Sequence, residues 1–335
     1  MNSTYPQFLH LANRARLDTG GVKRERHDRE ERGESGRNVR QRRAPRATMC
    51  AVATPKGGDT KTTSTSNIGV AWAKNNPAQR VLIIASDPCA GSAGGLATVG
   101  RQLFLGDSPP AHGLDELVRY LLDALENRPR RQFLDHLFVS RTKVENLDVM
   151  VAGRDLGSVK ERMGHLRYGQ NRLLKNSEHF QNLVNKYDAV FVDTEGVSAD
   201  DSVLLRNVLF CCDKILVPMV PSTEESFSRV KELDNTLRQF RAELCNVEFA
   251  TSLFFARVCN GGVGTAAQKE LMNKVTRWAR QSDIRVLNNT IPDDELVRAS
   301  ATVKFRPVVQ WRPGSSPAAK QYLEVANVLA RLWRL

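Results

Sequence analysis

The feature that most constrains this chain is a stretch rich in lysine, glycine and threonine at residues 56–62. It follows an apolar, strand-like run at residues 50–53 and precedes a helix-like run that begins at Thr63. This order of strand, glycine-containing loop and helix is typical of a P-loop nucleotide site. The alternative is a glycine–lysine turn that binds no ligand, but such a turn rarely has this spacing between a strand and a helix.

The residues of this loop have expected parts in binding a nucleotide. Lys61 takes the usual phosphate-binding position and would neutralise β- and γ-phosphate oxygens, while Thr62 would hold Mg²⁺ with Thr63 beside it. Backbone N–H groups at the start of the helix would point at the phosphates, and the helix dipole adds partial positive charge. The loop residues that we expect to contact the nucleotide are Gly57, Gly58, Asp59, Thr60, Lys61 and Thr62.

Two other strand-like runs end in a carboxylate. The run at residues 80–85 is followed by Asp87, which could position an attacking water or a Mg²⁺-bound water. The run at residues 189–192 is followed by Asp193, a Walker B pattern in which the carboxylate would bind Mg²⁺ through water. Each signal alone is unspecific, since Asp-Pro also begins turns, but the order of the three motifs indicates one nucleotide site.

Short apolar runs alternate with helical patterns from Met49 onward. This alternation predicts an α/β fold of the P-loop NTPase type, with a doubly wound, mostly parallel sheet and helices on both faces. Right-handed crossovers would place the ligand-binding loops at the carboxyl ends of the strands. The predicted strands are residues 50–53, 80–85, 147–151, 189–193, 214–220, 251–256 and 286–288. The predicted helices are residues 62–74, 114–125, 178–186, 202–210, 226–240, 266–281 and 317–332.

Basic residues exceed acidic ones, and the net charge is +12. Residues 1–48 hold twelve Arg or Lys and six Asp or Glu, so their net charge of 12 − 6 = +6 is half of the total. Such a composition cannot offset the entropy of ordering, so we expect a disordered extension before a folded domain at residues 49–335. The extension would be a DNA-touching arm or a solvated tail, or translation would begin at Met49. The surplus favours contact with polyanions; a basic protein without such a partner is the alternative.

Other features of the sequence narrow the class of protein. The six cysteines form no C-x-x-C pair, which disfavours an iron–sulfur or zinc site and favours reduced thiols. No apolar run approaches the length of a transmembrane helix, and residues 1–17 do not resemble a secretory signal. We therefore expect a cytoplasmic protein.

The motifs together resemble the ParA/MinD family of deviant Walker A ATPases, and most of all its small plasmid-partition ParA proteins. The resemblance extends from about Met49 to the C-terminal region. The segments that carry it are residues 55–63, 80–88, 146–156, 187–196, 213–221 and 291–323.

The resemblance implies a bacterial, nucleoid-associated ATPase that uses ATP and Mg²⁺. ATP would close a homodimer in which Lys56 reaches the phosphates of the partner, and Asp87 would be the hydrolytic residue. Adenine would pack against Pro292 and its neighbours. The dimer would bind DNA without sequence preference, and a centromere-binding partition protein would stimulate hydrolysis and release. The implied function is plasmid or chromosome segregation.

Three residues depart from the family pattern. Ala85 replaces the first carboxylate of its Asp-x-Asp-Pro segment, and Asp59 brings negative charge near the phosphates unless its side chain points outward. Thr60 replaces a glycine, and a positive φ at this β-branched residue would cost about 1–2 kcal/mol. We therefore expect nucleotide binding with slow turnover, and a hydrolysis-deficient DNA-binding scaffold stays an alternative.

Basic residues of the C-terminal half could form a face for DNA phosphates, or an ordinary solvated surface. The basic residues considered are Arg257, Lys269, Lys274, Arg277, Arg280, Arg298, Lys304, Arg306 and Arg312. No helix-turn-helix domain is evident, which disfavours operator recognition.

A MinD-like membrane-cycling ATPase is a further alternative, in which the last helix, with Trp333, lies on a membrane. The family's usual packing of that helix on the core disfavours this alternative.

Overall fold

The computed structural model describes residues 46–54, 60–87, 112–129, 132–166, 172–196, 202–244, 249–302 and 306–333. The predictions for residues 1–45 and for Lys56, Gly57, Gly58, Asp59 and Lys304 lie outside these residues. Strand β1 (Thr48–Val52) begins one residue before the predicted start of the folded domain at Met49, and Ala47 before it is already buried.

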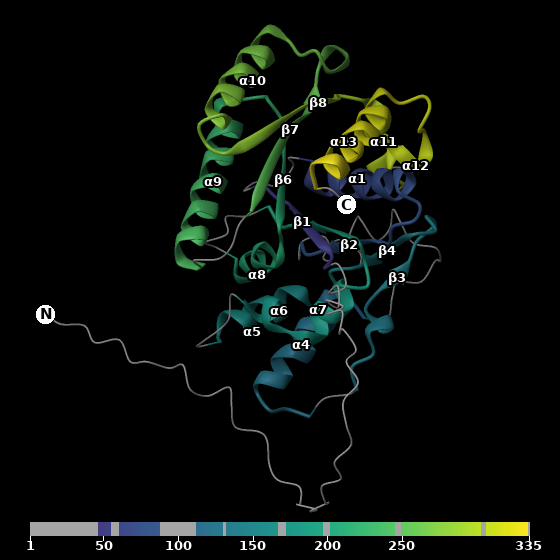
Figure 1. The fold of residues 1–335 in the computed structure, drawn as a ribbon, viewed down its shortest axis with the longest axis vertical. Helices are drawn as coiled ribbons and strands as arrows, with labels where there is room; N and C mark the ends of the chain where they lie inside the picture. The colour runs from purple at the N-terminus through teal and green to yellow at the C-terminus, as the bar shows by residue number, and fades with distance from the viewer. Residues whose placement is uncertain are drawn as a thin grey trace, which may run out of the picture. The chain divides into compact units, whose positions relative to one another are not determined.

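A mixed sheet carries the fold (Figure 1). Within the described residues it has eight strands in the order β3-β4-β2-β5-β1-β6-β7-β8, and every neighbouring pair is parallel except β3 with β4. Strands β2 and β5 are buried along their whole length, as expected where helices cover both faces. The predicted doubly wound, mostly parallel sheet is confirmed. Its strands are β1 (Thr48–Val52), β2 (Val81–Ala85), β3 (Ser140–Arg141), β4 (Leu147–Met150), β5 (Ala189–Asp193), β6 (Lys214–Met219), β7 (Ala250–Val258) and β8 (Ile284–Pro292).

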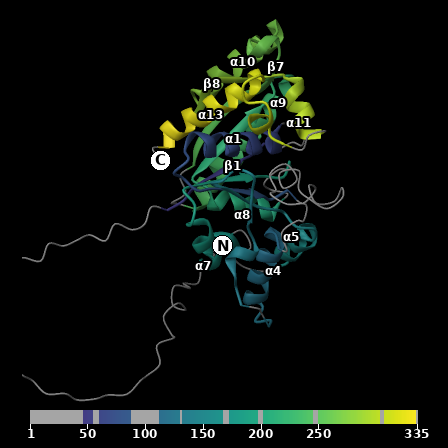
Figure 2. The ribbon, with the colours of Figure 1, turned by 90° about the vertical axis from the view of Figure 1, so that its right-hand side faces the viewer.

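Helices lie on both sides of this sheet (Figure 2). Helices α1, α11 and α13 lie on one side, and α4, α5, α7 and α8 lie on the other. Helix α1 packs on β2 and β5, whereas α8 packs on β1. The predicted helices are all present, with ends that differ by up to four residues. The helices are α1 (Lys61–Asn75), α4 (Leu114–Leu125), α5 (Leu156–Gly164), α6 (Leu173–Asn176), α7 (Glu178–Val184), α8 (Val203–Cys211), α9 (Glu224–Leu244), α10 (Ala266–Ala279), α11 (Glu295–Thr302), α12 (Val308–Trp311) and α13 (Pro317–Trp333).

The last helix, α13, packs on α1 and on β8. Trp333 near its end lies against Trp72 of α1, with 5.1 Å between ring centroids, and Trp72 in turn meets Phe191 of β5 at 5.5 Å. The apolar side of α13, including Tyr322 and Leu329, is therefore buried in the protein. This packing leaves that side of α13 inside the fold, whereas the membrane alternative requires it to lie on a bilayer.

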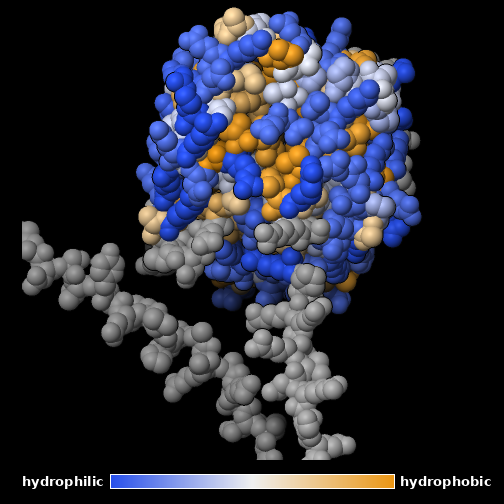
Figure 3. All heavy atoms as spheres, turned by 45° about the horizontal axis from the view of Figure 1, so that its top comes forward, coloured by the Kyte–Doolittle hydropathy of each residue, from blue (hydrophilic) through white to orange (hydrophobic). Residues whose placement is uncertain are grey.

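The surface is mostly hydrophilic. Among the described residues, the large hydrophobic side chains with high exposure are those of Leu125, Leu134 and Val263. Figure 3 shows one face on which hydrophilic residues form the border and hydrophobic residues gather in the hollowed centre. None of the described helices combines the length and apolarity needed to span a bilayer.

Candidate functional site

The carboxyl ends of β1, β2 and β5 are tied together at one edge of the sheet. Ser86, directly after β2, donates from its backbone N at 2.9 Å and from its Oγ at 2.8 Å to the carbonyl oxygen of Asp193. Thr194 Oγ1 donates to the carbonyl oxygen of Val52 at 2.8 Å. These bonds bring the ends of the three strands together. Asp193 ends β5, Asp87 follows β2, and Lys61 begins the helix after β1, whereas Pro292 ends β8.

The first turn of α1 is fastened to the end of β5. Thr62 Oγ1 donates to Asp193 Oδ2 at 2.8 Å across a separation of 131 residues, and Thr65 Oγ1 lies 3.3 Å from Asp193 Oδ1. Lys61 begins the helix, and its Nζ lies 3.4 Å from Thr54 Oγ1. The structure thus brings together Lys61, Thr62 and Asp193, which the sequence places in separate motifs.

The environment of Asp193 suits a cation. Burial raises the pKa of Asp193 to about 7, the hydrogen bond from Thr62 opposes this rise, and the negative charge of Asp87 adds to it. A neighbouring positive charge favours the ionised form of such a carboxyl. Carboxylate and hydroxyl oxygens are also the ligand types that Mg²⁺ prefers. The Thr62–Asp193 pair therefore fits a hard divalent cation.

Thr60, directly before α1, has a left-handed backbone with φ 62° and ψ 13°. Its carbonyl oxygen accepts the first bond of the helix, from the Ser64 N at 2.7 Å. Thr60 therefore has the positive φ at which we expected a β-branched residue to be strained and a glycine not to be. Backbone strain of this kind concentrates at ligand sites, where the surrounding structure holds it.

Replacing Thr60 with glycine is expected to raise the free energy of unfolding by roughly 1 kcal/mol, because glycine adopts this φ without the Cβ clash. Chemical denaturation of the full chain measures the change. A matched control is Thr276→Gly inside α10, where glycine should instead lower stability by roughly 0.5–1 kcal/mol. A Thr60→Gly variant that is less stable than the parent would contradict the strain.

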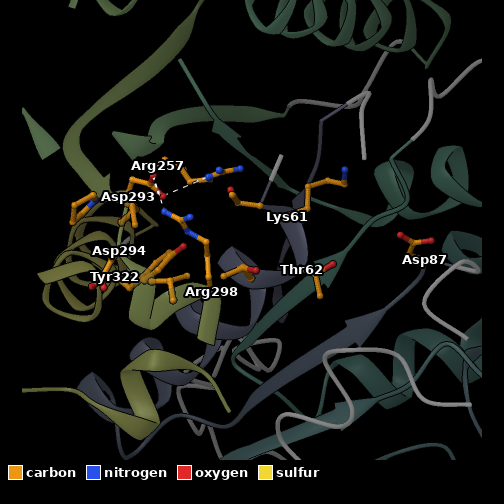
Figure 4. Close-up of a pocket in the computed structure, with 14 residues that line it drawn as sticks. Lys61, Thr62, Asp87, Arg257, Asp293, Asp294, Arg298 and Tyr322 are labelled. Atoms are coloured by element: carbon orange, nitrogen blue, oxygen red, sulfur yellow. Dashed lines mark hydrogen bonds and ion pairs between the residues drawn. The ribbon is translucent and has the colours of Figure 1, made fainter. Parts of the chain in front are cut away.

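A cavity of about 430 Å³ opens at the N-terminus of α1 (Figure 4). In this view Asp87 lies at one end, Lys61 and Thr62 lie in the middle, and Asp293 and Arg298 lie at the other end. The lining therefore runs from the end of β2 past the start of α1 to the turn between β8 and α11. Its residues are Thr60, Lys61, Thr62, Thr63, Asp87, Ala256, Arg257, Ile291, Pro292, Asp293, Asp294, Val297, Arg298 and Tyr322.

Two arginines converge on Asp293 at the far end of the cavity. Arg298 Nη2 lies 3.0 Å from Asp293 Oδ2, and Arg257 Nε lies 3.6 Å from Asp293 Oδ1. Arg257 has a left-handed φ of 54° where the pairing of β7 with β8 is irregular. Arg257 and Arg298 therefore line the cavity, and their side chains keep 49% and 60% of their surface exposed. Their contact with DNA stays a prediction.

Other residues fix the turn that follows β8. Asp294 Oδ1 accepts from the Leu296 N at 2.9 Å, and its Oδ2 accepts from Ser316 Oγ at 2.6 Å, which joins the starts of α11 and α13.

Burial raises the pKa of Tyr322 to about 12, so its phenol stays protonated beside the cavity. Pro292 lies in the lining, in the position where the resemblance implied contact with a base.

A second buried carboxylate lies near Asp87 and was missed in the sequence. Glu195 Oε2 accepts from Lys160 Nζ at 2.7 Å, and its Oε1 accepts from Ser202 Oγ. Burial raises the pKa of Glu195, the Lys160 hydrogen bond opposes this, and the charge of Asp87 adds to it. The available signal was a glutamate two residues after the Walker B aspartate. Glu195 thus supplies negative charge at the edge where Ala85 lacks a carboxylate.

Comparison with known proteins identifies the family. A family model described as an AAA domain matches residues 47–250, more than half of the chain. An uncharacterized protein of Mycobacterium tuberculosis strain H37Rv is 25% identical over 278 residues, which cover 81% of this chain and 75% of that protein.

Solved structures share the fold. Cobyrinic acid a,c-diamide synthase from Mycobacterium smegmatis, with bound ADP and magnesium, has a TM-score of 0.62 at 22% identity, covering 86% of this chain and 96% of its own. Apo McdA of Cyanothece has a TM-score of 0.62 at 16% identity, with coverage of 84% and 99%. A plasmid partition protein from Borrelia burgdorferi has a TM-score of 0.52 at 17% identity, with coverage of 86% and 100%. With the family match and the site geometry, these findings show that the chain belongs to the ParA/MinD family of P-loop ATPases.

Proposed function

We propose that this protein is an ATP-dependent DNA-partition ATPase. ATP assembles a homodimer that binds DNA without sequence preference, and a centromere-binding partition protein stimulates hydrolysis and release. The observation that carries the proposal is the bond between Thr62 and Asp193 at the start of α1, beside the buried Lys61. The solved structure of a Borrelia burgdorferi plasmid partition protein, which shares the fold, is consistent with this role.

The residues at the cavity fit ATP and Mg²⁺. Lys61 and the backbone N–H groups of the first turn of α1 would hold the phosphates. Thr62 and Asp193 would hold Mg²⁺, which would neutralise charge on the phosphate oxygens when bound. The structurally similar cobyrinic acid a,c-diamide synthase was solved with ADP and magnesium, which supports the same pair of ligands here.

The arrangement of the lining indicates how ATP would lie. The base would lie at the end with Ile291, Pro292 and Arg298, and the terminal phosphate would point toward Asp87. The predicted contact of Lys56 with the phosphates of a second copy belongs to this proposal, as do the loop contacts of Gly57, Gly58 and Asp59.

Charge supports DNA as the partner. The net charge of +12 favours contact with phosphates through release of counterions. Arg257, Lys274 and Arg298 each pair with a carboxylate and stay about half exposed. The other basic residues considered for DNA that the structure describes are exposed, and they are Lys269, Arg277, Arg280, Arg306 and Arg312. We place this activity at the nucleoid of a bacterial cytoplasm.

Binding to a random-sequence duplex, measured with ATP, with ADP and without nucleotide, tests the proposal. We expect ATP with Mg²⁺ to raise DNA affinity at least about tenfold, a free-energy gain of about 1.4 kcal/mol. Lys56→Ala should lose this gain because the dimer no longer closes over the phosphates, whereas Lys320→Ala, on the exposed side of α13, should keep it.

Equal binding in the three nucleotide states would contradict the switch. If ATP turnover were also undetectable, the hydrolysis-deficient scaffold would be the better description. The left-handed Thr60 and the missing carboxylate at Ala85 are the observations that favour this second function.

A further inference from the structure

A second cavity, of about 700 Å³, lies at the opposite end of the strands from the ATP-side cavity. It forms where β6, β7 and β8 begin, beside the last described turn of α13. Its volume is in the range of small-molecule sites. The polar groups of its lining include Lys214, Arg241, Thr251, Ser252 and Arg285.

Four donors of this cavity lack acceptors among the described residues, whereas Arg241 Nη2 already donates to the carbonyl oxygen of Phe249 at 2.6 Å. Lys214, Thr251, Ser252 and Arg285 have side chains that make no hydrogen bond or ion pair with any residue that the structure describes. Three neighbouring strands bring Lys214, Ser252 and Arg285 to one face of the sheet, since Lys214 pairs with Ala250 and Ser252 pairs with Arg285. Ammonium and guanidinium groups donate only, and hydroxyls can donate as well. Such a group of donors suits a ligand with several negatively charged oxygens.

Two carboxylates near the cavity weaken the positive potential of Lys214 and Arg285 only in part. Asp213 is already engaged, because its Oδ2 accepts from the Met49 N at 3.2 Å and its Oδ1 lies 3.9 Å from an Arg46 nitrogen. Asp283, which has a left-handed φ of 54°, lines the cavity and opposes an anion. Removing its charge should therefore strengthen anion binding, which gives the test a variant of opposite sign.

One wall of the cavity is apolar. Trp333 and Leu332 of α13 line it together with the buried Phe249. The Trp333 ring is held against Trp72, so the wall has a fixed position. A planar apolar group on the ligand would pack on such a wall, since aromatic surfaces bury area at little entropic cost.

We propose that this cavity binds a small anion that carries a planar apolar group, of the class of aromatic phosphates. Lys214 and Arg285 hold the anionic oxygens, Ser252 on the same face of the sheet adds a hydroxyl hydrogen bond, and Trp333 packs on the ring.

Calorimetric titration of the full chain with phenyl phosphate tests this site. Binding should have the same affinity with and without saturating ADP and Mg²⁺, because the two cavities are separate. Lys214→Gln and Arg285→Gln should each weaken it at least about tenfold, the size of one lost charge-assisted hydrogen bond. Asp283→Asn should tighten it about two- to fivefold. Lys269→Gln and Arg280→Gln, matched exposed controls outside the cavity, should change it less than twofold.

Thermal melting of each variant checks that the fold is kept, and Arg285→Gln at an exposed strand position carries the test if Lys214→Gln unfolds. The proposal is overturned if phenyl phosphate does not bind, or if it binds both variants as tightly as the parent. It is also overturned if the two substitutions weaken binding of a DNA duplex while phenyl phosphate has no site, since the cations would then belong to a polyanion surface.

Discussion

Replacing Lys61 with alanine is expected to lower kcat/KM for ATP hydrolysis by about 10²–10³-fold, the loss typical of one preorganised charge stabiliser. Lys61 is only 5% exposed, so its charge acts where water screens it little. Its Nζ lies 3.4 Å from Thr54 Oγ1 at the end of β1, which holds the ammonium at the helix N-terminus where phosphates would bind.

Steady-state phosphate release measures turnover, and calorimetry with a non-hydrolysable ATP analogue measures binding. The matched control is Lys74→Ala on the same helix, whose Nζ donates to the carbonyl oxygen of Val309 at 3.0 Å. This variant should lose some stability and keep turnover within about twofold. Turnover that survives in Lys61→Ala would show that the cavity at α1 is not where ATP is hydrolysed.

The sequence predicts the centre of the sheet better than its edge. Strand β5 and helix α4 have the predicted bounds, because an unbroken apolar run and a regular helical pattern leave little freedom. Strand β8 extends over Ile284–Pro292, far beyond the predicted residues 286–288. Among the described strands it pairs with β7 alone, so exposed polar residues such as Arg285 interrupt its apolar pattern. The two-residue strand β3 and the four-residue helices α6 and α12 carry too little pattern to predict. Helices α5 and α11 were also not predicted.

The residues of the candidate site also divide into those that local sequence patterns predict and those that they do not. Lys61, Thr62 and Asp193 were found because strand, loop and helix follow one another in the chain, and parallel pairing brings their ends together. The place of Arg257 and Arg298 at the cavity was not predicted, because a basic residue in a sequence does not reveal its neighbour. Arg298 meets Asp293 across five residues of the turn after β8, whereas Arg257 reaches the same carboxylate from β7, 36 residues earlier.

Asp87→Asn is expected to separate binding from hydrolysis. Turnover should fall about 10²-fold or more, the size of the contribution of a positioned acid–base group, while binding of a non-hydrolysable ATP analogue should stay within about threefold. Asp87 lies at the end of the cavity away from Asp293 and Arg298, so its loss leaves the base end untouched. The substitution keeps the size of the side chain, and one less negative charge near Asp193 should not weaken analogue binding.

Asp155→Asn is the matched control, since that carboxylate is exposed and bonds Arg119 at 2.8 Å outside the cavity. It should keep full turnover. If Asp87→Asn hydrolyses ATP normally, Glu195 becomes the better candidate for the hydrolytic residue. Its carboxylate lies near enough to Asp87 to feel that charge, and Lys160 holds it in place. If analogue binding collapses along with turnover, Asp87 serves the bound phosphates rather than the hydrolytic step. Hydrolysis lost with ATP-dependent DNA binding kept would place Asp87 at the release step, because a dimer that cannot hydrolyse ATP stays on DNA.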